Sequence, residues 1–200
     1  MANIISFLAL IIAITVHEFS HAFVADRLGD PTPRSNGRLS LNPMAHADMV
    51  GTILLPLIGL FTGLPTIGWA KPVPIDPYNL SNPKRDRLLI ALAGPLSNFI
   101  VAIIFALISK FLSINLIVIY IIILVNISIA IFNLIPIPPL DGSQILLSIL
   151  PQETADKWEE AFSKYGLILL LAFLFLPIGG STLVSIIMGP VVKAILNFIV

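Results

Sequence analysis

The chain has 200 residues, of which 57% are hydrophobic and only 11% are charged, and its mean hydropathy is +1.00. Soluble domains carry about 25% charged residues, so this composition predicts an integral membrane protein with little mass outside the bilayer. The formal net charge of zero argues against nucleic acid as a partner. The chain has no cysteine, which excludes disulfides and thiolate metal sites, so any metal would be held by His, Asp or Glu.

The first predicted element is a membrane-spanning helix over residues 3–25, which ends at the Gly and Pro of the polar segment that follows. It lacks a basic amino-terminal region and a small-residue cleavage site, so we expect a retained span and not a signal peptide. Within it, His17 and His21 lie one helical turn apart, where both imidazoles can reach one metal ion. Glu18 lies beside them, where a carboxylate can accept a proton from water. A lone buried His is most simply a core residue, but three ionisable side chains in this motif predict a metal site.

The next 60 residues are irregular by sequence. Residues 34–48 form a polar loop, in which His46 and Asp48 either approach the site or, as we favour, only fold their own loop. Residues 49–67 are apolar but interrupted by Gly and Pro, which predicts a re-entrant or β-like membrane-edge segment that does not cross the bilayer. Residues 69–87 form a Pro-rich, basic linker.

Two further spans are predicted over residues 88–109 and 114–135. After them, residues 152–164 predict a solvated amphipathic helix, and residues 165–200 predict one span with an interfacial helix or two short spans, broken at 177–180 and 189–190. The fold class is therefore an all-α polytopic membrane protein with a three-span core. We expect one domain over 1–200, with the core at about 3–142 and a carboxy-terminal membrane segment at about 165–200.

The distribution of basic residues predicts the topology. Seven of them lie between the first two spans, and the positive-inside rule places all seven in the cytoplasm if residues 49–67 do not cross. The amino terminus and the link near Lys110 are then outside. The first span and the span over 114–135 run in the same direction, from outside to inside. The seven residues are Arg27, Arg34, Arg38, Lys71, Lys84, Arg85 and Arg87.

A catalytic zinc site needs at least one more protein ligand besides two His. Val24 and Arg27 occupy the positions at which a longer zinc motif would have Gly and a third His. Asp141 differs from the other candidates because it ends an apolar span through a Pro-rich segment, which at membrane depth must be buried or line a cavity. In the predicted topology, Asp141 and His21 approach the same side. The other candidates are His46, Asp26, Asp30, Asp48, Asp76 and Asp86.

Three motifs together resemble the site-2 protease family of intramembrane zinc metalloproteases. They are the His17–His21 motif, Ala-Gly-Pro-Leu-Ser-Asn at 93–98, and Asn133 to Pro136 leading to Asp141-Gly142. The loop over 41–48 and the segment over 68–74 resemble the short prokaryotic branch, which lacks PDZ and CBS domains. The resemblance covers about residues 4–142.

The resemblance implies one Zn²⁺ ion held by His17, His21 and Asp141, with Glu18 as general base. It also implies an active-site role for Asn133, in binding the substrate backbone or the developing oxyanion. The expected reaction is peptide-bond hydrolysis in or near a transmembrane helix of a membrane-protein substrate, by a multi-pass enzyme of the cell membrane whose site faces the cytoplasm. We further hypothesise that an extended strand or a re-entrant loop within 49–67 pairs with the unwound substrate.

Two other functions remain open on the sequence. The first is a divalent-metal transporter, which would have no use for Glu18 as a base and would show repeats or further ionisable residues along a path. The second is a proteolytically inactive scaffold that binds membrane partners, against which the intact Glu18 argues.

Overall fold

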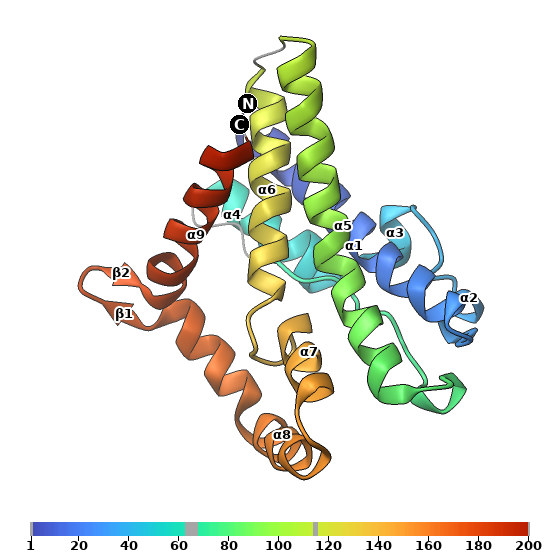
Figure 1. Ribbon diagram of the computed structural model, residues 1–200. Coiled ribbons are helices and arrows are strands. Elements are labelled where there is room, and N and C mark those ends of the chain that lie inside the picture. Colours follow the sequence, from blue (N-terminus) through green and yellow to red (C-terminus); the bar gives the residue numbers. More distant parts are fainter. Residues whose placement is uncertain (1, 63–67, 114–115, 200) are drawn as a thin grey trace.

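The computed structural model describes residues 2–62, 68–113 and 116–199, and these residues are predominantly helical (Figure 1). Three long helices form the centre, and the remaining elements surround them or extend from their ends. The elements are α1 (Ala2–Arg27), α2 (Thr32–Ser35), α3 (Pro43–His46), a π-helix (Met49–Leu54), α4 (Leu55–Thr62), a 3₁₀ turn (Pro77–Asn79), α5 (Pro83–Phe111), α6 (Ile117–Asn133), α7 (Asp141–Ile149), α8 (Gln152–Phe175), β1 (Pro177–Ile178), β2 (Ser181–Thr182) and α9 (Leu183–Ile199).

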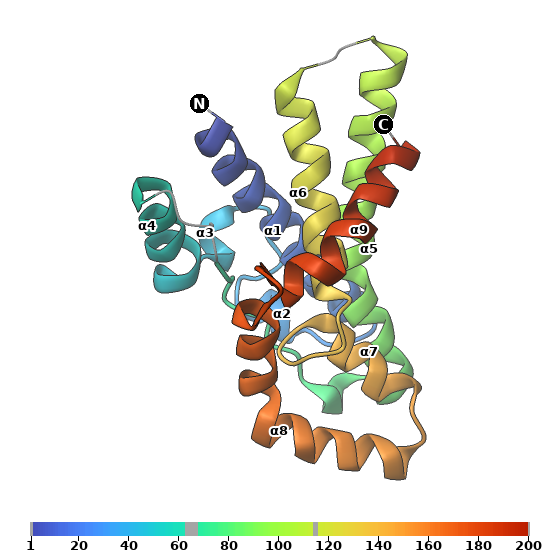
Figure 2. The same cartoon turned by 90° about the vertical axis from the view of Figure 1, so that its left-hand side faces the viewer.

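The central bundle consists of α1, α5 and α6. Figure 2 shows α1 and α6 with their amino-terminal ends toward the same end of the molecule, whereas α5 runs in the opposite direction. Small side chains at the contacts let helices in an apolar medium approach closely, which strengthens their van der Waals packing. The buried small residues of these helices are Ala9, Ala13, Ala22, Ala25, Ala91, Gly94, Ala102, Ala106 and Ala130.

The outward faces of the bundle are apolar. Large hydrophobic side chains on α1 and α5 are exposed, among them Ile4, Leu8, Ile100 and Ile104. Both helices are long and apolar enough to cross a membrane, over Asn3–Arg27 and Pro83–Phe111. The helices α6 and α9 have 17 residues each and are therefore about 25 Å long, close to the thickness of a bilayer core. The expected helical fold is confirmed, and two of the expected spans are long apolar helices.

The β-like interpretation of the segment over 49–67 is wrong for residues 49–62, which are helical; residues 63–67 lie outside the described residues. The helix starts at Asp48, whose carboxylate accepts the backbone N–H groups of Val50 and Gly51 at 3.0 and 2.7 Å. Pro56 has no N–H group, so it cannot donate to the Gly51 carbonyl one π-helical turn earlier. That carbonyl instead accepts a hydrogen bond from the N–H of Trp69 at 3.2 Å. Gly51, Pro56 and Gly59 are therefore accommodated within helical structure that continues over residues 49–62.

The carboxy-terminal region also differs from the expectation. The predicted boundary between a surface helix ending at 164 and a new segment from 165 does not exist, because α8 runs through both, and Figure 2 shows it changing direction along its length. A short β-hairpin follows, turning through Gly179 and Gly180 at φ +58° and +85°, values that glycine adopts without strain. The predicted break at 189–190 is also wrong, because α9 continues through Pro190.

A buried carboxylate joins the end of α1 to the linker before α5. Asp30 is 0% exposed, and it accepts hydrogen bonds from the backbone N–H groups of Thr32 and Asp76 and from the Asn79 amide at 2.8–3.0 Å. Burial by itself raises the pKa of Asp30, but these hydrogen bonds to the ionised form outweigh it and lower the pKa below the usual 3.8. The ionised carboxylate therefore holds two distant loop segments together.

Replacing this carboxylate tests that link. A native pKa below the unfolded value means that ionised Asp30 stabilises the fold above the unfolded pKa, and that this contribution is lost as pH falls through the native pKa. We expect Asp30→Asn to lower the free energy of unfolding by about 1–3 kcal/mol at neutral pH and to weaken the dependence of stability on pH below about 4. Thermal unfolding in detergent across pH measures both effects. Asp156→Asn, at an exposed carboxylate of α8, serves as the control, and equal behaviour of the two variants would contradict the prediction.

Candidate active site

Two helices and one loop bring three metal-ligating side chains together. The Nε2 atoms of His17 and His21 lie 3.0 and 3.3 Å from the same carboxylate oxygen of Asp141, Oδ2. The ligand atoms of all three residues lie within 4.8 Å of one another, and both His are buried. Among the described residues, this is the one group of three such side chains close enough to share an ion.

Buried acceptors determine which nitrogen of each imidazole carries the hydrogen. Nδ1 of His21 lies 2.7 Å from the carbonyl oxygen of Ile90, which can only accept, so this nitrogen is the donor. Nδ1 of His17 lies 2.7 Å from Oδ1 of Asn98, whose Nδ2 donates to the carbonyl of Ala13 at 3.0 Å. Because that carbonyl fixes the orientation of the amide, His17 also donates through Nδ1. In a neutral ring, both Nε2 atoms then carry lone pairs directed at Asp141.

The orientation of Asn98 is fixed further by a second buried amide. Nδ2 of Asn98 also donates to Oδ1 of Asn126 on α6 at 2.9 Å, and Nδ2 of Asn126 donates to the Ile122 carbonyl at 2.9 Å. Asn98 and Asn126 are 0% and 2% exposed. This chain of hydrogen bonds connects α1, α5 and α6 within the apolar bundle and holds the His17 ring in place.

Asp141 is positioned by the segment between α6 and α7. The helix α6 ends at Asn133, residues 134–140 form turns, and Asp141 is the first residue of α7. A Cβ at Gly142 would overlap the carbonyl oxygens of Leu134 and Ile135, so the loop closes onto α7 only because residue 142 is glycine. The predicted interruption of the helix before Asp141 is present, and it turns the carboxylate back toward α1.

Space for an ion is left on the side of α5. A Cβ at Gly94 would come within 2.6 Å of Nε2 of His17 and would overlap Nε2 of His21. Asp141 Oδ2 is buried and has no hydrogen-bond partner in the part of the chain that the structure describes. Two nitrogen lone pairs and a carboxylate oxygen converge, and none of these three atoms carries a hydrogen that it could donate to another. A cation between them would satisfy all three. Two imidazoles and one carboxylate fit a divalent metal such as Zn²⁺.

Of the two residues predicted to act in catalysis, Glu18 lies on the helix of the two histidines, and Asn133 lies on the helix that precedes the loop to Asp141. Glu18 follows His17 in α1 and is half-buried, and its carboxylate has no hydrogen bond or ion pair within the described residues. Asn133 is the last residue of α6 and is half-buried, and its amide donates to the carbonyl of Ile129 at 3.1 Å. The catalytic roles of Glu18 and Asn133 stay predictions. The roles of His17, His21 and Asp141 as metal ligands stay predictions as well.

The remaining ligand candidates have structural partners of their own. Nε2 of the buried His46 donates to the carbonyl of Ser40 at 2.7 Å, which agrees with the loop-folding interpretation. The carboxylates cap helices, close turns or pair with a nearby cation. Asp48 caps the π-helix, Asp76 accepts from Tyr78 N, Asp86 accepts from Asn82 N, Asp30 joins the loops described above, and Asp26 accepts two hydrogen bonds from Arg34.

Sequence reasoning missed the buried acceptors that orient the imidazoles. Asn98 belongs to the motif over 93–98, which was noted for its resemblance alone, and its contact with His17 spans 81 residues. Asn126 had one available signal, a polar side chain in the middle of an apolar run. The Ile90 carbonyl had none, because every residue has a carbonyl group.

Comparison with known proteins identifies the family of the chain. The family model of peptidase family M50 matches residues 5–115 and 113–177. The chain belongs to peptidase family M50, the site-2 protease family. This membership confirms the predicted family and the assignment as a metalloprotease, and together with the two long apolar helices it indicates a membrane protein.

The curated relatives carry names of the same kind. The chain is 35% identical over 195 residues to "Putative zinc metalloprotease YwhC" of Bacillus subtilis, which covers 88% of this chain and 82% of that protein. It is 28% identical over 150 residues to "Zinc metalloprotease MJ0392" of Methanocaldococcus jannaschii, covering 74% of this chain and 34% of the relative. It is 26% identical to "Putative zinc metalloprotease Rip2" of Mycolicibacterium smegmatis, covering 84% and 65%. No solved structure matches the chain.

The space at Gly94 gives the first test of the metal site. We expect Gly94→Ala to reduce bound metal strongly, because the added methyl group would occupy the position between the two Nε2 atoms. Elemental analysis of the purified protein gives the metal-to-protein ratio. Gly189→Ala is the matched control, because a Cβ there meets no atom within 4 Å. A Gly94→Ala protein with unchanged metal content would contradict the placement of the ion.

The hydrogen bond to His17 gives the second test. We expect Asn98→Leu to lower metal affinity about 10–100-fold, because the imidazole loses the acceptor that fixes its orientation. The control is Ser97→Ala, since the Ser97 hydroxyl bonds the Gly94 carbonyl of its own helix. Competition against a chelator of known affinity measures the change. Equal affinities for the two variants would show that Asn98 does not position the ligand.

Proposed function

We propose that this M50 protein is an intramembrane zinc metalloprotease that hydrolyses peptide bonds within or near transmembrane helices of membrane-protein substrates. The observation that carries the proposal is the convergence of His17, His21 and Asp141 inside a bundle whose outer faces are apolar. An enzyme built in this way acts on chains that enter its bundle from the bilayer.

The donor set supports a single Zn²⁺ ion. His17 and His21 present lone pairs through Nε2, and Asp141 presents a buried oxygen without a hydrogen-bond partner among the described residues. Three protein ligands of this kind are typical of catalytic zinc sites. Zinc in such a site supplies a Lewis acid that polarises a carbonyl group and lowers the pKa of water.

The protein groups divide the remaining chemistry between them. Glu18 accepts a proton from the attacking water and passes it to the leaving amine. Its carboxylate is available for this role because it has no hydrogen bond or ion pair with the residues that the structure describes. Asn133 binds the substrate backbone or the developing oxyanion, and to do so its amide exchanges the bond to Ile129 for one to the substrate.

The position of the site along the helices supports cleavage near the cytoplasmic face. His21 lies six residues before the end of α1, which is about 9 Å along the helix. The seven basic residues between α1 and the first turns of α5 lie toward that end of the bundle, and the positive-inside rule assigns it to the cytoplasm. Strand pairing by residues 49–62 has no part in the proposal, since these residues are helical.

The decisive experiment compares wild type with Glu18→Gln on single-span substrates in proteoliposomes. We expect cleavage to fall about 10²–10⁴-fold while the zinc content is unchanged, because the variant removes the base and keeps the ligands. Glu153→Gln, on the exposed start of α8, is the control that preserves activity.

Other outcomes separate the rival functions. Equal cleavage by wild type and Glu18→Gln would refute the mechanism. Zinc flux into vesicles that persists in Glu18→Gln would indicate a transporter. Substrate capture without cleavage by wild type would indicate a scaffold.

A further inference from the structure

The buried side of α8 is a single narrow stripe. Its buried residues are Ala155, Phe162, Gly166 and Phe173. They are separated by seven, four and seven residues, so at 3.6 residues per turn they lie within about 40° of one another around the helix. We call this stripe the inner face of α8.

The outward surface of α8 changes along the helix, whereas the inner face does not. Before position 165 the exposed side chains are mostly charged, such as Glu153 and Asp156, and after it they are apolar, such as Leu167 and Ile168. This change explains the predicted boundary at 164. The buried stripe runs through that boundary, so both halves of α8 contribute to one packing surface.

The two ends of the inner face contact the two ends of one segment of the chain. Phe162 packs against Leu147 of α7, and the ring centroid of Phe173 lies 6.5 Å from that of Phe132 in the last turn of α6. Figure 2 shows α8 crossing the end of the bundle near α7 and then turning to run along it. The segment between these contacts, residues 132–147, carries the carboxylate of the metal site and the asparagine proposed to bind substrate.

Gly166 lies between these two contacts and approaches the loop of the segment closely. A Cβ at this position would lie 3.0 and 3.1 Å from Cβ and Cγ of Pro138, so a neighbour would have to move by a few tenths of an ångström. On either side of Gly166, α8 is held by the buried rings of Phe162 and Phe173. The displacement would therefore fall mainly on the loop.

The loop would pass such a displacement on to the metal site. Proline at 136, 138 and 139 fixes φ at three positions, which leaves the loop few ways to absorb a shift. Pro138 lies three residues before Asp141, whose Oδ2 is 3.0 and 3.3 Å from the two imidazole nitrogens. Metal sites tolerate only about 0.2 Å of change in their ligand distances. A shift of the size that a Cβ at 166 requires is therefore large enough to weaken metal binding.

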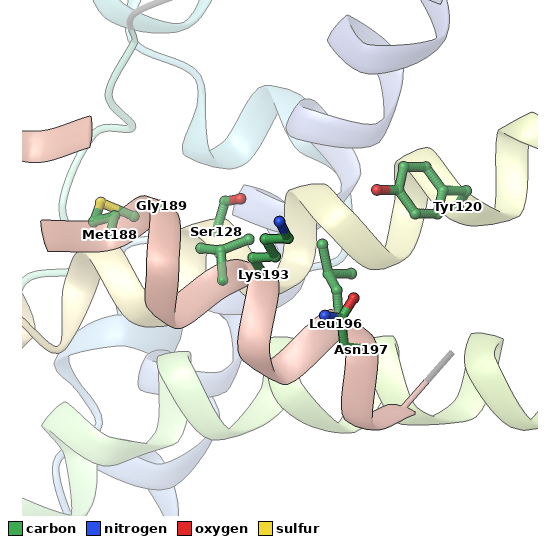
Figure 3. Close-up of a pocket in the computed structure, with 8 residues that line it drawn as sticks. Tyr120, Ser128, Met188, Gly189, Lys193, Leu196 and Asn197 are labelled. Atoms are coloured by element: carbon green, nitrogen blue, oxygen red, sulfur yellow. The ribbon is translucent and has the colours of Figure 1, made fainter. Parts of the chain in front are cut away.

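The helix α9 leaves room where α8 does not. A pocket of about 770 Å³ opens between α6 and α9, lined by Tyr120 and Ser128 of α6 and by residues of α9 that include Gly189 and Lys193 (Figure 3). A Cβ at Gly189 meets no atom within 4 Å. Gly189 is therefore a matched control for Gly166, because both are glycines within long helices beside the bundle.

We propose that the inner face of α8 positions residues 132–147 for the reaction, and that Gly166 is a positioning residue that sets the place of Asp141 through Pro138. The inference deepens the proposed function, on which the role of Asn133 rests. It also gives a part in the active site to a helix that lies beyond residues 4–142, which carry the sequence motifs.

The experiment compares Gly166→Ala with Gly189→Ala in the full-length protein. Alanine is a better helix former than glycine, so neither substitution is expected to unfold its helix. We expect Gly166→Ala to bind Zn²⁺ about tenfold more weakly in competition with a chelator, and Gly189→Ala to bind it as wild type does. The visible absorption of the Co²⁺-loaded protein is expected to change in Gly166→Ala alone, because it depends on the arrangement of the ligands.

A double variant tests the path through Pro138. Pro138→Ala removes Cγ, one of the two atoms that a Cβ at 166 would approach most closely, and lets the backbone shift. We expect Gly166→Ala to reduce zinc affinity less in the Pro138→Ala background than in wild type. Equal effects in the two backgrounds, or wild-type affinity and an unchanged Co²⁺ spectrum in Gly166→Ala, would overturn the proposal.

Phe173→Leu tests the other end of the inner face. Its partner Phe132 directly precedes Asn133, so we expect kcat to fall about tenfold while zinc affinity stays close to that of wild type. Phe175→Leu, at an exposed ring of the same helix, is the matched control. Equal kcat for the two variants would contradict the proposal, and this comparison decides it if Gly166→Ala has no folded state by its melting temperature.

Zinc affinity and Co²⁺ absorption are measured without substrate, which separates this inference from the proposed function. A lower affinity of Gly166→Ala, in a protein whose wild type cleaves nothing, contradicts the proposed function alone. An unchanged affinity and spectrum, in a protein whose wild type cleaves its substrate, contradict this inference alone.

Discussion

The structure depends on two short hydrogen bonds between buried imidazoles and acceptors on a neighbouring helix. His17 and His21 each use Nδ1 to bond α5, through the Asn98 amide and the Ile90 carbonyl. These bonds leave both Nε2 atoms as lone-pair donors on the same side as Asp141. In an apolar bundle, few other partners compete for these polar groups, so the bonds fix the distance and rotation between α1 and α5 as well as the tautomers.

Two glycines make this geometry possible. Gly94 leaves the volume between the imidazoles open, and Gly142 lets the loop after α6 close onto α7, which turns Asp141 toward α1. Both positions would be blocked by a single methyl group. The site therefore depends on the close approach of backbone segments. The hydrogen bonds determine the orientation of the imidazoles, and the glycines determine how closely α5 and the loop after α6 approach the site.

The polar groups of the site specify the charge of what it binds. Near the end of α1, the imidazoles and the carboxylate of Asp141 converge as electron-pair donors, which suits a cation. The surroundings of these groups are apolar, so few other partners can satisfy them.

The sequence by itself determined the helical membrane class, the metal motif, the family and the special status of Asp141, because hydropathy, i and i+4 spacing and helix termination act within short stretches. It did not determine that residues 49–62 are helical, because the N–H group that Pro56 lacks is replaced by that of Trp69, a residue outside this segment. It also did not determine that α8 and α9 continue through the positions at which breaks are predicted. Only the tertiary structure decided which acceptors orient His17 and His21, and that Asn126 supports one of them. Those contacts join residues 28 to 85 positions apart, and no local pattern encodes which side chains meet across three packed helices.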